Sequence, residues 1–533
     1  MSINYSAQQR LVGSLRNPDR YPHAAKAVRL METHISWVLL AGRYAYKLKK
    51  AVDLGFLDFT DLDARRFYCE EEIRLNCRFA PQLYLEVVAI GGSPEHPELG
   101  AKPAIEYAVK MRRFASAKLM DRLMTRGLVT PVHIDSLAAT LAAFHLNLPP
   151  AERDSEFGCL EAIHAPAVQN FDQLSPLLTT VDAETLAGLR QASEHEYAAC
   201  MPLFRQRRQD GWIRECHGDL HLGNIALVRG KPTPFDGIEF NAGFRWIDVM
   251  NEIAFLVMDL LHHNRPDLAF RFLNGYLEAT GDYQGMGVLR FYLAYRATVR
   301  AKVAAIRARQ PDTQPHEARD AVAVCRGHLE LAATCLARRP PFLIITYGLP
   351  GCGKTTVAQA ILERLQAIRL RSDVERKRLF GLTARDNSRS GIGSGIYSAE
   401  ATRKTYGRLH DLARSLLADG FPVIVDAAFL RHAERERFRQ LAHEMAIPFV
   451  IVSIRAGESI LHQRIMQRLD RASDASEADL AVLKALQTAH EPLQAPELAS
   501  AVEFVNDGDI GKIAARASFW SVLEEMVARR SLK

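Results

Sequence analysis

The sequence predicts two mixed domains, an α+β domain followed by an α/β domain, on three observations. The chain has 533 residues, more than one hydrophobic core of about 250 to 300 residues can hold. Strand-like and helical runs are grouped before residue 335 but alternate after it, which indicates a parallel sheet in the second part. Between the two parts, Pro340 and Pro341 bar the continuation of a helix. We therefore expect domains at residues 1–335 and 342–533, with a linker at 336–341.

The composition excludes several classes of protein. Hydrophobic residues make up 48% and charged residues 24%, so a disordered, collagen-like or disulfide-scaffold protein is excluded. The formal net charge of +6 suits an anionic substrate such as ATP, although a solvated surface with slightly more arginine explains it as well. The 8 cysteines contain no C-x-x-C pair, so we expect most of them to be small buried hydrophobes in a reducing compartment.

The N-terminal residues and the apolar runs predict a cytoplasmic protein. Residues 1–20 are polar and lack the hydrophobic stretch of a secretory signal. No apolar run reaches the roughly 18 residues that a membrane span requires. We expect no membrane partner.

The first domain begins with elements that predict a sheet with one inserted helix. The strand-like runs are residues 33–40, 43–49, 83–90 and 104–111, and the first two are joined as in a hairpin at Ala41-Gly42. A helix is predicted over 62–79, with Asp61 as its cap. Long amphipathic segments then dominate, at residues 134–146, 184–207, 249–262, 269–278 and 289–309. We expect a small sheet lobe followed by a larger helical lobe.

A polar stretch between these helices carries the first chemical motif. It contains His217-Gly218-Asp219, with Asn224 five residues after the aspartate and Asp236 twelve residues further on. An aspartate that accepts a hydroxyl proton, an asparagine that binds Mg²⁺ and a second chelating aspartate form the phosphoryl-transfer arrangement of protein-kinase-like folds. We predict Asp219 as the catalytic base and Asn224 and Asp236 as metal ligands. The alternative is that these polar residues only satisfy a buried turn.

A lysine and a glutamate are expected to complete this first site. Lys47 lies in a strand-like run and is predicted to bind the ATP phosphates, with Lys49 on the same face as the alternative. The following helix offers Glu70, Glu71 and Glu72 as partners of the lysine. We favour Glu71 because it lies one turn before Leu75.

Residues 30–310 resemble the aminoglycoside phosphotransferase family, which also contains choline, homoserine and fructosamine kinases. The resemblance implies a bilobal protein-kinase-like fold, a hinge at 107–115 that meets adenine, and Asp248 as an anchor for the catalytic loop. Two departures stand out. No glycine-rich loop is visible in the first hairpin, and the helical segments lack an acidic cluster for a polycationic aminoglycoside, so antibiotic resistance is not implied.

The second domain contains a phosphate-binding motif. Gly348-Leu349-Pro350-Gly351-Cys352-Gly353-Lys354-Thr355 matches G-x-x-x-x-G-K-[ST] between a buried strand and a helix that opens with Thr356. The glycines let backbone amides surround the β-phosphate, Lys354 reaches the β and γ oxygens, and the Thr355 hydroxyl ligates Mg²⁺. Oxidation of Cys352 within the loop is expected to block ATP binding.

Further residues are predicted to serve this second site. Asp373 follows a short apolar run and is predicted to be the catalytic carboxylate, although it also suits a helix cap. Asp426 ends the next strand and is predicted to hold Mg²⁺ through water, with a plain turn aspartate as the alternative. Arg464 and Arg468 are predicted to lie on a lid that closes on the phosphates, or else on a solvated helix face.

This half resembles the small-molecule P-loop kinases, a group with gluconate kinase, chloramphenicol phosphotransferase and the zeta toxins. The resemblance implies a parallel sheet flanked by helices, Asp373 beside the acceptor hydroxyl, and Asn506-Asp507-Gly508 beside adenine.

The whole chain resembles a bacterial fusion of an aminoglycoside-phosphotransferase-like domain with a P-loop kinase. We expect ATP, Mg²⁺ and small-molecule hydroxyl substrates. The alternatives are that one half is an ATP-binding regulatory module, or that the P-loop half is a polynucleotide 5′-hydroxyl kinase. The arginines at 376, 378, 435, 437 and 439 are explained more simply as solvated helix faces, so a nucleic-acid partner is not expected.

Overall fold

An antiparallel sheet of six strands, in the order β1-β2-β3-β6-β4-β5, forms the N-terminal lobe. The computed structural model describes residues 4–529 apart from 56, 311–312, 385, 389, 392, 472–476 and 509–515. The strands are β1 (Val28–Glu32), β2 (Ser36–Ala41), β3 (Tyr44–Lys49), β4 (Tyr84–Gly92), β5 (Pro97–Leu99) and β6 (Glu106–Arg112). The predicted hairpin is confirmed, because β2 and β3 pair across a turn in which Gly42 has a φ of +55°.

Two helices cover opposite faces of this sheet. Helix α1 (Tyr5–Ser14) packs Leu11 on the face that carries Tyr46 and Leu48 of β3. Helix α2 (Leu62–Asn76) packs Cys69 on the face that carries Ala45. Since strand residues alternate between faces, the side chains at 47 and 49 turn toward α2. Asp61 caps α2 as predicted, because its carboxylate accepts the amides of Asp63 and Ala64.

The second lobe is helical and is built around one buried helix. Its helices are α3 (Met120–Thr125), α4 (Pro131–Asn147), α5 (Leu160–Leu174), α6 (Thr180–Gln209), α7 (Val249–His262), α8 (Pro266–Thr280), α9 (Met286–Ala308) and α10 (Pro315–Leu336). Two short antiparallel pairs accompany them: β7 (Ile213–Glu215) with β10 (Trp246–Asp248), and β8 (Ile225–Val228) with β9 (Lys231–Pro234). Residues 249–260 of α7 are buried without interruption. The predicted bilobal α+β organisation is therefore confirmed.

A parallel sheet of five strands, in the order β12-β13-β11-β14-β15, forms the C-terminal half. The strands are β11 (Leu343–Tyr347), β12 (Ile368–Arg371), β13 (Val423–Asp426), β14 (Phe449–Arg455) and β15 (Ala501–Val505). The helices are α11 (Lys354–Leu365), α12 (Ser372–Leu379), α13 (Ala399–Ala418), α14 (His432–Glu444), α15 (Glu458–Arg471), α16 (Leu480–Thr488), α17 (Ala495–Leu498) and α18 (Ala517–Ala528). The predicted α/β class, a parallel sheet flanked by helices, is confirmed.

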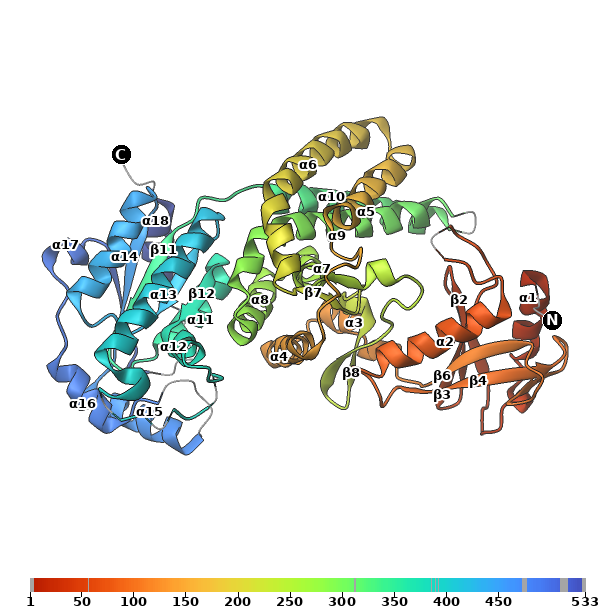
Figure 1. Cartoon of the computed structure of the whole chain (residues 1–533), viewed down its shortest axis with the longest axis horizontal. Coiled ribbons are helices and arrows are strands. Elements are labelled where there is room, and N and C mark those ends of the chain that lie inside the picture. The colour runs from red at the N-terminus through yellow and green to blue at the C-terminus, as the bar shows by residue number, and fades with distance from the viewer. Residues whose placement is uncertain are drawn as a thin grey trace.

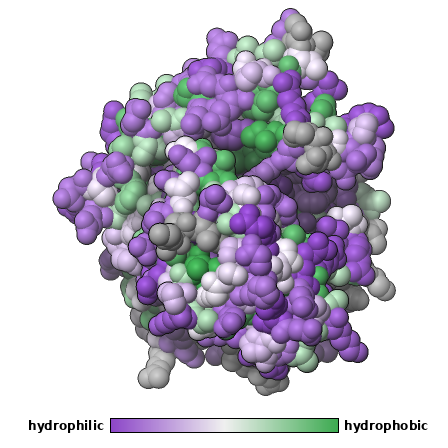
Figure 2. Space-filling view, turned by 90° about the vertical axis from the view of Figure 1, so that its right-hand side faces the viewer, coloured by the Kyte–Doolittle hydropathy of each residue, from purple (hydrophilic) through white to green (hydrophobic). Residues whose placement is uncertain are grey.

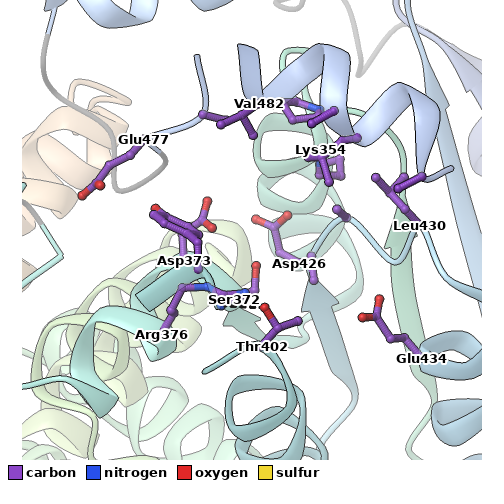
Figure 3. Close-up of a pocket in the computed structure, with 18 of the residues that line it drawn as sticks. Lys354, Ser372, Asp373, Arg376, Thr402, Asp426, Leu430, Glu434, Glu477 and Val482 are labelled. Carbon is purple, nitrogen blue, oxygen red and sulfur yellow. Dashed lines mark hydrogen bonds between the residues drawn. The ribbon is translucent and has the colours of Figure 1, made fainter. Parts of the chain in front are cut away.

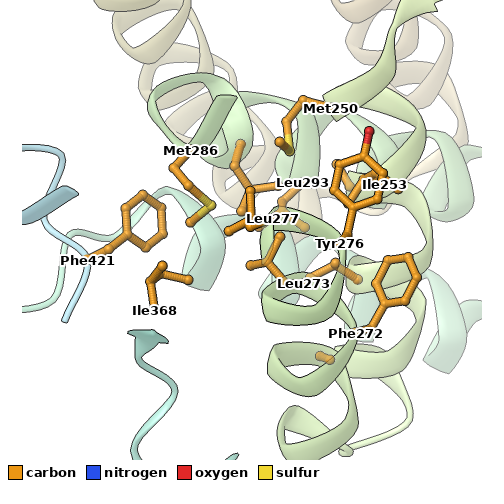
Figure 4. Packing of buried hydrophobic residues seen from close by; sticks show 14 of the residues in the cluster. Met250, Ile253, Phe272, Leu273, Tyr276, Leu277, Met286, Leu293, Ile368 and Phe421 are labelled. Atoms are coloured by element: carbon orange, nitrogen blue, oxygen red, sulfur yellow. The ribbon is translucent and has the colours of Figure 1, made fainter. Parts of the chain in front are cut away.

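The helical lobe and the C-terminal half share one hydrophobic core. Figure 1 shows the sheet lobe, the helical lobe and the C-terminal half in a row, with α8 facing the strand β12. Leu277 of α8 and Met286 of α9 belong to the same buried cluster as Ile368 and Phe421 of the C-terminal half (Figure 4). Burial of each such side chain contributes about 1.5 to 3 kcal/mol, so the contact between the halves is substantial.

The surface bears few large apolar areas at the end formed by the sheet lobe. That end is mainly hydrophilic, with hydrophobic residues scattered among polar ones (Figure 2). Within the described part of the chain, every helix is too short or too polar to cross a membrane.

Candidate active sites

In the N-terminal half, Lys47 lies at the centre of a buried ion network. Its Nζ donates to Glu72 Oε1 at 2.9 Å and to Asp236 Oδ1 at 2.5 Å. Burial alone would lower the pKa of Lys47, but the carboxylates of Asp236 and Glu72 raise it well above its usual value. The ammonium group is therefore charged, and the sheet lobe and the second lobe are joined through it.

The prediction that Glu71 pairs with this lysine is wrong. Glu71 is 17% exposed and binds Arg74 at 2.8 Å, whereas Glu72 is fully buried against the sheet. The buried stripe of α2 runs through residues 65, 69, 72 and 76, so residue 72 is the one that faces β3. The lysines pull the pKa of Glu72 down to about 2 although burial acts in the opposite direction.

Lys49 lies in the same network and does not replace Lys47. It donates to Glu72 Oε2 at 2.9 Å and to Glu239, a residue that the sequence reasoning did not assign. Only Lys47 also contacts Asp236, the residue predicted to bind metal. Glu239 belongs to the segment Asp236-Gly-Ile-Glu239, so its spacing from the aspartate that is predicted to bind metal was the available signal.

The loop before β8 brings Asp219 and Asn224 together. The Asn224 amide nitrogen donates to Asp219 Oδ2 at 2.8 Å and to the Asp219 carbonyl at 3.0 Å. The nitrogen is used in these bonds, so the amide oxygen is the atom suited to a cation. Burial alone would raise the pKa of Asp219, but the nearby His221 and Arg300 bring it below its usual range. Asp219 is therefore ionised at neutral pH.

A buried glutamate, and not Asp248, holds this loop. Glu252 of α7 accepts the backbone amides of His217 at 2.9 Å and Gly218 at 2.7 Å. Asp248 instead forms a buried ion pair with Arg207, at 2.7 Å. The expectation that Asp248 anchors the loop directly is thus wrong, because the anchor lies one helical turn further along α7.

The first site carries a donor set that suits Mg²⁺. Hard divalent cations prefer carboxylate and amide oxygens, and Asp236 and Asn224 offer these two types. The Asp236 side chain remains 42% exposed, so it is accessible to a ligand.

His145, Cys216 and Glu252 also lie within 4.8 Å of one another, but their polar atoms are engaged. Tyr276 and Glu252 bind the two ring nitrogens of His145, and burial keeps Cys216 a thiol by raising its pKa. This cluster is a structural network.

In the C-terminal half, the loop between β11 and α11 has the geometry of a phosphate cradle. Gly348, Gly351 and Gly353 adopt φ values of +153°, +85° and +95°, in the region that favours glycine. A Cβ atom on Gly348 would lie 2.4 Å from the Ile454 carbonyl. Lys354 Nζ lies over the loop and donates to the carbonyls of Gly348 and Leu349 at 3.0 Å.

A cavity of about 1310 Å³ opens at this loop. Its lining includes these residues of the predicted site: Pro350, Gly351, Gly353, Lys354, Thr355, Thr356, Asp373, Asp426 and Arg464. The carboxylates of Asp373 and Asp426 point toward the same space (Figure 3). Cys352 is buried beneath the loop with 1% exposure, and burial raises the pKa of its thiol.

The two carboxylates differ in their surroundings. Asp373 lies in the first turn of α12, whose cap position is Arg371, so Asp373 is not the helix cap. Asp426 is 5% exposed, and its Oδ2 has no hydrogen-bond partner among the described residues. Burial raises the pKa of Asp426 despite Arg369, Arg371 and Lys354 nearby. A buried carboxylate oxygen without a partner, next to the Thr355 hydroxyl, fits a divalent cation.

Two further polar side chains, Arg464 and Asn506, lie close to the phosphate loop at residues 348–355. Arg464 of α15 donates to the Gly508 carbonyl at 3.1 Å, and the cavity lining includes it. Asn506 is 2% exposed and donates to the Cys352 carbonyl at 2.7 Å, which ties the end of β15 to the loop. Arg468 lies in α15, but its side chain is outside the described residues.

Comparison with known proteins finds a relative over most of the chain. Rv2004c, an uncharacterized protein of Mycobacterium tuberculosis, is 32% identical over 464 residues, which cover 86% of this chain and 90% of that protein. The family model described as an AAA domain matches residues 343–493. The adenylyl-sulfate kinase of Myxococcus xanthus is 28% identical over 194 residues, 36% of this chain and 95% of that enzyme.

Two solved kinases are each similar to one part of the chain. The choline kinase of Cryptosporidium parvum covers 62% of this chain and 95% of its own, at 10% identity and a TM-score of 0.38. A gluconokinase of Sinorhizobium meliloti covers 35% of this chain and 96% of its own, at 19% identity and a TM-score of 0.26.

Proposed function

Because the chain belongs to the family of the mycobacterial protein Rv2004c, which it matches across both halves, we propose that its shared activity is ATP- and Mg²⁺-dependent phosphoryl transfer. In this proposal both halves bind ATP and each transfers its γ-phosphate to a hydroxyl of a small molecule. The AAA-domain match at residues 343–493 supports the nucleotide site of the C-terminal half.

One observation carries the proposal for the C-terminal half. The cavity at the phosphate loop measures about 1310 Å³, whereas pockets for one drug-sized ligand span roughly 300 to 1,000 Å³. The space therefore accommodates ATP together with a second small molecule. Asp373 and Asp426 border it on the side of the phosphate loop.

In this half the chain's own groups position the reactants. The loop amides and Lys354 bind the β- and γ-phosphates, and Thr355 and Asp426 hold Mg²⁺. Bound Mg²⁺ neutralises charge on the phosphate oxygens. Asp373 accepts the proton of the acceptor hydroxyl. The oxygen of that hydroxyl bonds to the γ-phosphorus while the bond between the γ-phosphorus and ADP breaks. Arg464 adds positive charge beside the phosphates.

In the N-terminal half, Lys47 binds the nucleotide phosphates while Glu72 fixes its position. Asn224 and Asp236 hold Mg²⁺, and Asp219 orients the acceptor hydroxyl and takes its proton. The low pKa of Asp219 makes it a weak base. We therefore assign it mainly an orienting role, with proton transfer late in the reaction.

A regulatory role for the N-terminal half is the second candidate, and the first hairpins favour it. The turns between β1, β2 and β3 span residues 33–35 and 42–43, too short for a loop that covers phosphates. The polynucleotide-kinase alternative has less support, because two of its arginines are already paired with carboxylates. Arg435 is buried and its Nε donates to Glu497 at 2.6 Å, and Arg439 Nε donates to Glu436 at 2.7 Å.

The test is transfer of labelled γ-phosphate from ATP into fractionated small metabolites. The full chain is compared with Asp219→Ala and Lys354→Ala. Loss of a different labelled product in each variant supports two kinase sites. Loss of all products in Lys354→Ala alone supports the regulatory role, and unchanged labelling in both variants contradicts the proposal.

A further inference from the structure

A partly buried carboxylate of the helical lobe contacts the C-terminal half next to its proposed nucleotide site. Glu278 of α8 accepts Arg371 Nη1 at 2.7 Å and Arg369 Nη2 at 3.0 Å, both from β12. The exposed fractions of these side chains are 19% for Glu278, 13% for Arg371 and 7% for Arg369. Burial alone would raise the pKa of Glu278, but the two guanidinium groups lower it, so the carboxylate is charged.

The two arginines continue from Glu278 into the nucleotide site. Arg369 Nη1 donates to the Thr355 carbonyl at 3.3 Å. Arg371 Nε lies 3.9 Å from Asp426 Oδ2, the oxygen without a hydrogen-bond partner among the described residues. One arginine therefore separates the carboxylate of the helical lobe from the carboxylate that suits a metal.

The position of β12 is also fixed by α8. Asn274 of α8 accepts the Arg369 amide at 2.7 Å and donates to the Ala367 carbonyl at 3.0 Å. These bonds resemble those of a neighbouring strand at the open edge of the sheet. The backbone of Arg371 thus has little freedom along the strand, so any exchange between Glu278 and Asp426 must come from rotation of the Arg371 side chain.

The charges around Arg371 are in competition. Glu278 draws the guanidinium to hydrogen-bond distance, while Asp426 lies just outside it. If the charge of Glu278 is removed, Asp426 becomes the stronger acceptor of these two, because an ionised carboxylate binds a guanidinium better than an amide does. A guanidinium bound to Asp426 would compete with a divalent cation for the same oxygen.

We propose that Glu278 is a positioning residue of the P-loop site, supplied by the helical lobe, which holds Arg371 beyond hydrogen-bond distance of Asp426 and leaves that carboxylate open to Mg²⁺. The inference rests on the proposed nucleotide site of the C-terminal half and goes beyond it. It makes the metal affinity of one half depend on a residue of the other.

The experiment measures binding of Mn²⁺ with saturating ADP by electron paramagnetic resonance. It uses the full chain carrying Asp236→Asn, so that the signal reports on the P-loop site. Glu278→Gln is expected to weaken Mn²⁺ binding about tenfold. Addition of Arg371→Gln is expected to restore binding to within about twofold, because the competing charge is gone. Arg371→Gln alone is expected to leave binding equal or tighter.

Glu363→Gln is the matched control. Glu363 of α11 binds Arg271 of α8 at 2.6 Å across the same interface but does not contact Asp426. It should leave Mn²⁺ binding unchanged. Far-ultraviolet circular dichroism checks that each variant is folded. If Glu278→Gln proves unstable, the double variant is compared with Arg371→Gln alone, since Arg369 keeps a side-chain oxygen at position 278 as its acceptor in both.

Three results would overturn the inference: unchanged binding in Glu278→Gln, weakened binding that Arg371→Gln does not restore, or weakened binding in Arg371→Gln alone. The readout needs no acceptor, so failure to find a phosphorylated product would contradict the proposed kinase activity and leave this inference standing. Absence of Lys354-dependent Mn²⁺ and ADP binding would overturn both.

Discussion

Replacement of Glu252 by glutamine tests whether one buried carboxylate maintains the loop that carries Asp219. Glu252 is 0% exposed and accepts two backbone amides, one on each oxygen. A glutamine side chain has only one acceptor oxygen, so its amide group would face one of these N–H groups as a donor. The variant therefore loses one bond and gains a repulsive contact in a buried site.

The size of the effect follows from the pKa of Glu252. Burial alone would raise it, but hydrogen bonding and charge from His145, and the charge of His217, lower it from 4.5 to about 2. A shift of this size corresponds to roughly 3 kcal/mol of folding free energy. Since the folded-state pKa is depressed, this stabilisation is complete above about pH 4.5 and is lost as the pH falls toward 2.

The assay is urea unfolding at pH 7, followed by circular dichroism, with labelled-product formation measured in parallel. We expect Glu252→Gln to lower the free energy of unfolding by about 3 kcal/mol and to reduce the product that depends on Asp219. Glu194→Gln removes a carboxylate that is 42% exposed in the same lobe, and should cost less than about 0.5 kcal/mol. An unchanged unfolding midpoint for Glu252→Gln would refute the reasoning.

Three further predictions test the two sites. Glu72→Gln should cost the N-terminal site about 2 kcal/mol or more of transition-state stabilisation in kcat/KM, whereas Glu71→Gln should change it less than about threefold; equal effects would contradict the pairing with Lys47. Lys354→Ala should lower the rate of the P-loop product about a hundredfold in initial-rate measurements without altering the other product, and a loss of both would contradict two independent kinase sites. The Cys352 thiol should react with maleimide far more slowly in the folded than in the urea-unfolded chain, as followed by mass spectrometry, because it is 1% exposed; rapid labelling of the folded chain would argue against a buried thiol.

Local motifs made most of the fold and the positions of both candidate sites predictable. The phosphate loop needs glycines, a lysine and a threonine at fixed spacing, and those residues lie together because they are neighbours in sequence. The hairpin at Gly42 and the cap at Asp61 were predictable for the same reason. The helix α1 and the strand β1 were not anticipated, because both are short and have weak periodicity.

Which of several adjacent residues of the same type serves a site was harder to predict. The choice between Glu71 and Glu72 depends on which face of α2 packs on the sheet, and the three consecutive glutamates hide that face. The small buried Cys69, three residues before Glu72, was the available signal. Glu278 gave no local signal at all, since its partners Arg369 and Arg371 are about ninety residues away in sequence.

The side chain of Asn274 has a consequence for how the protein can be divided. It occupies the edge of β12, and the apolar side chains of Ile368 and Phe421 lie against the helical lobe. A fragment that begins at β11 would present this strand edge and these side chains to solvent, a combination that promotes aggregation. Truncated fragments are therefore poor tools for assigning activity to either half. Single substitutions in the intact chain avoid that difficulty, because they leave the contact between α8 and β12 in place.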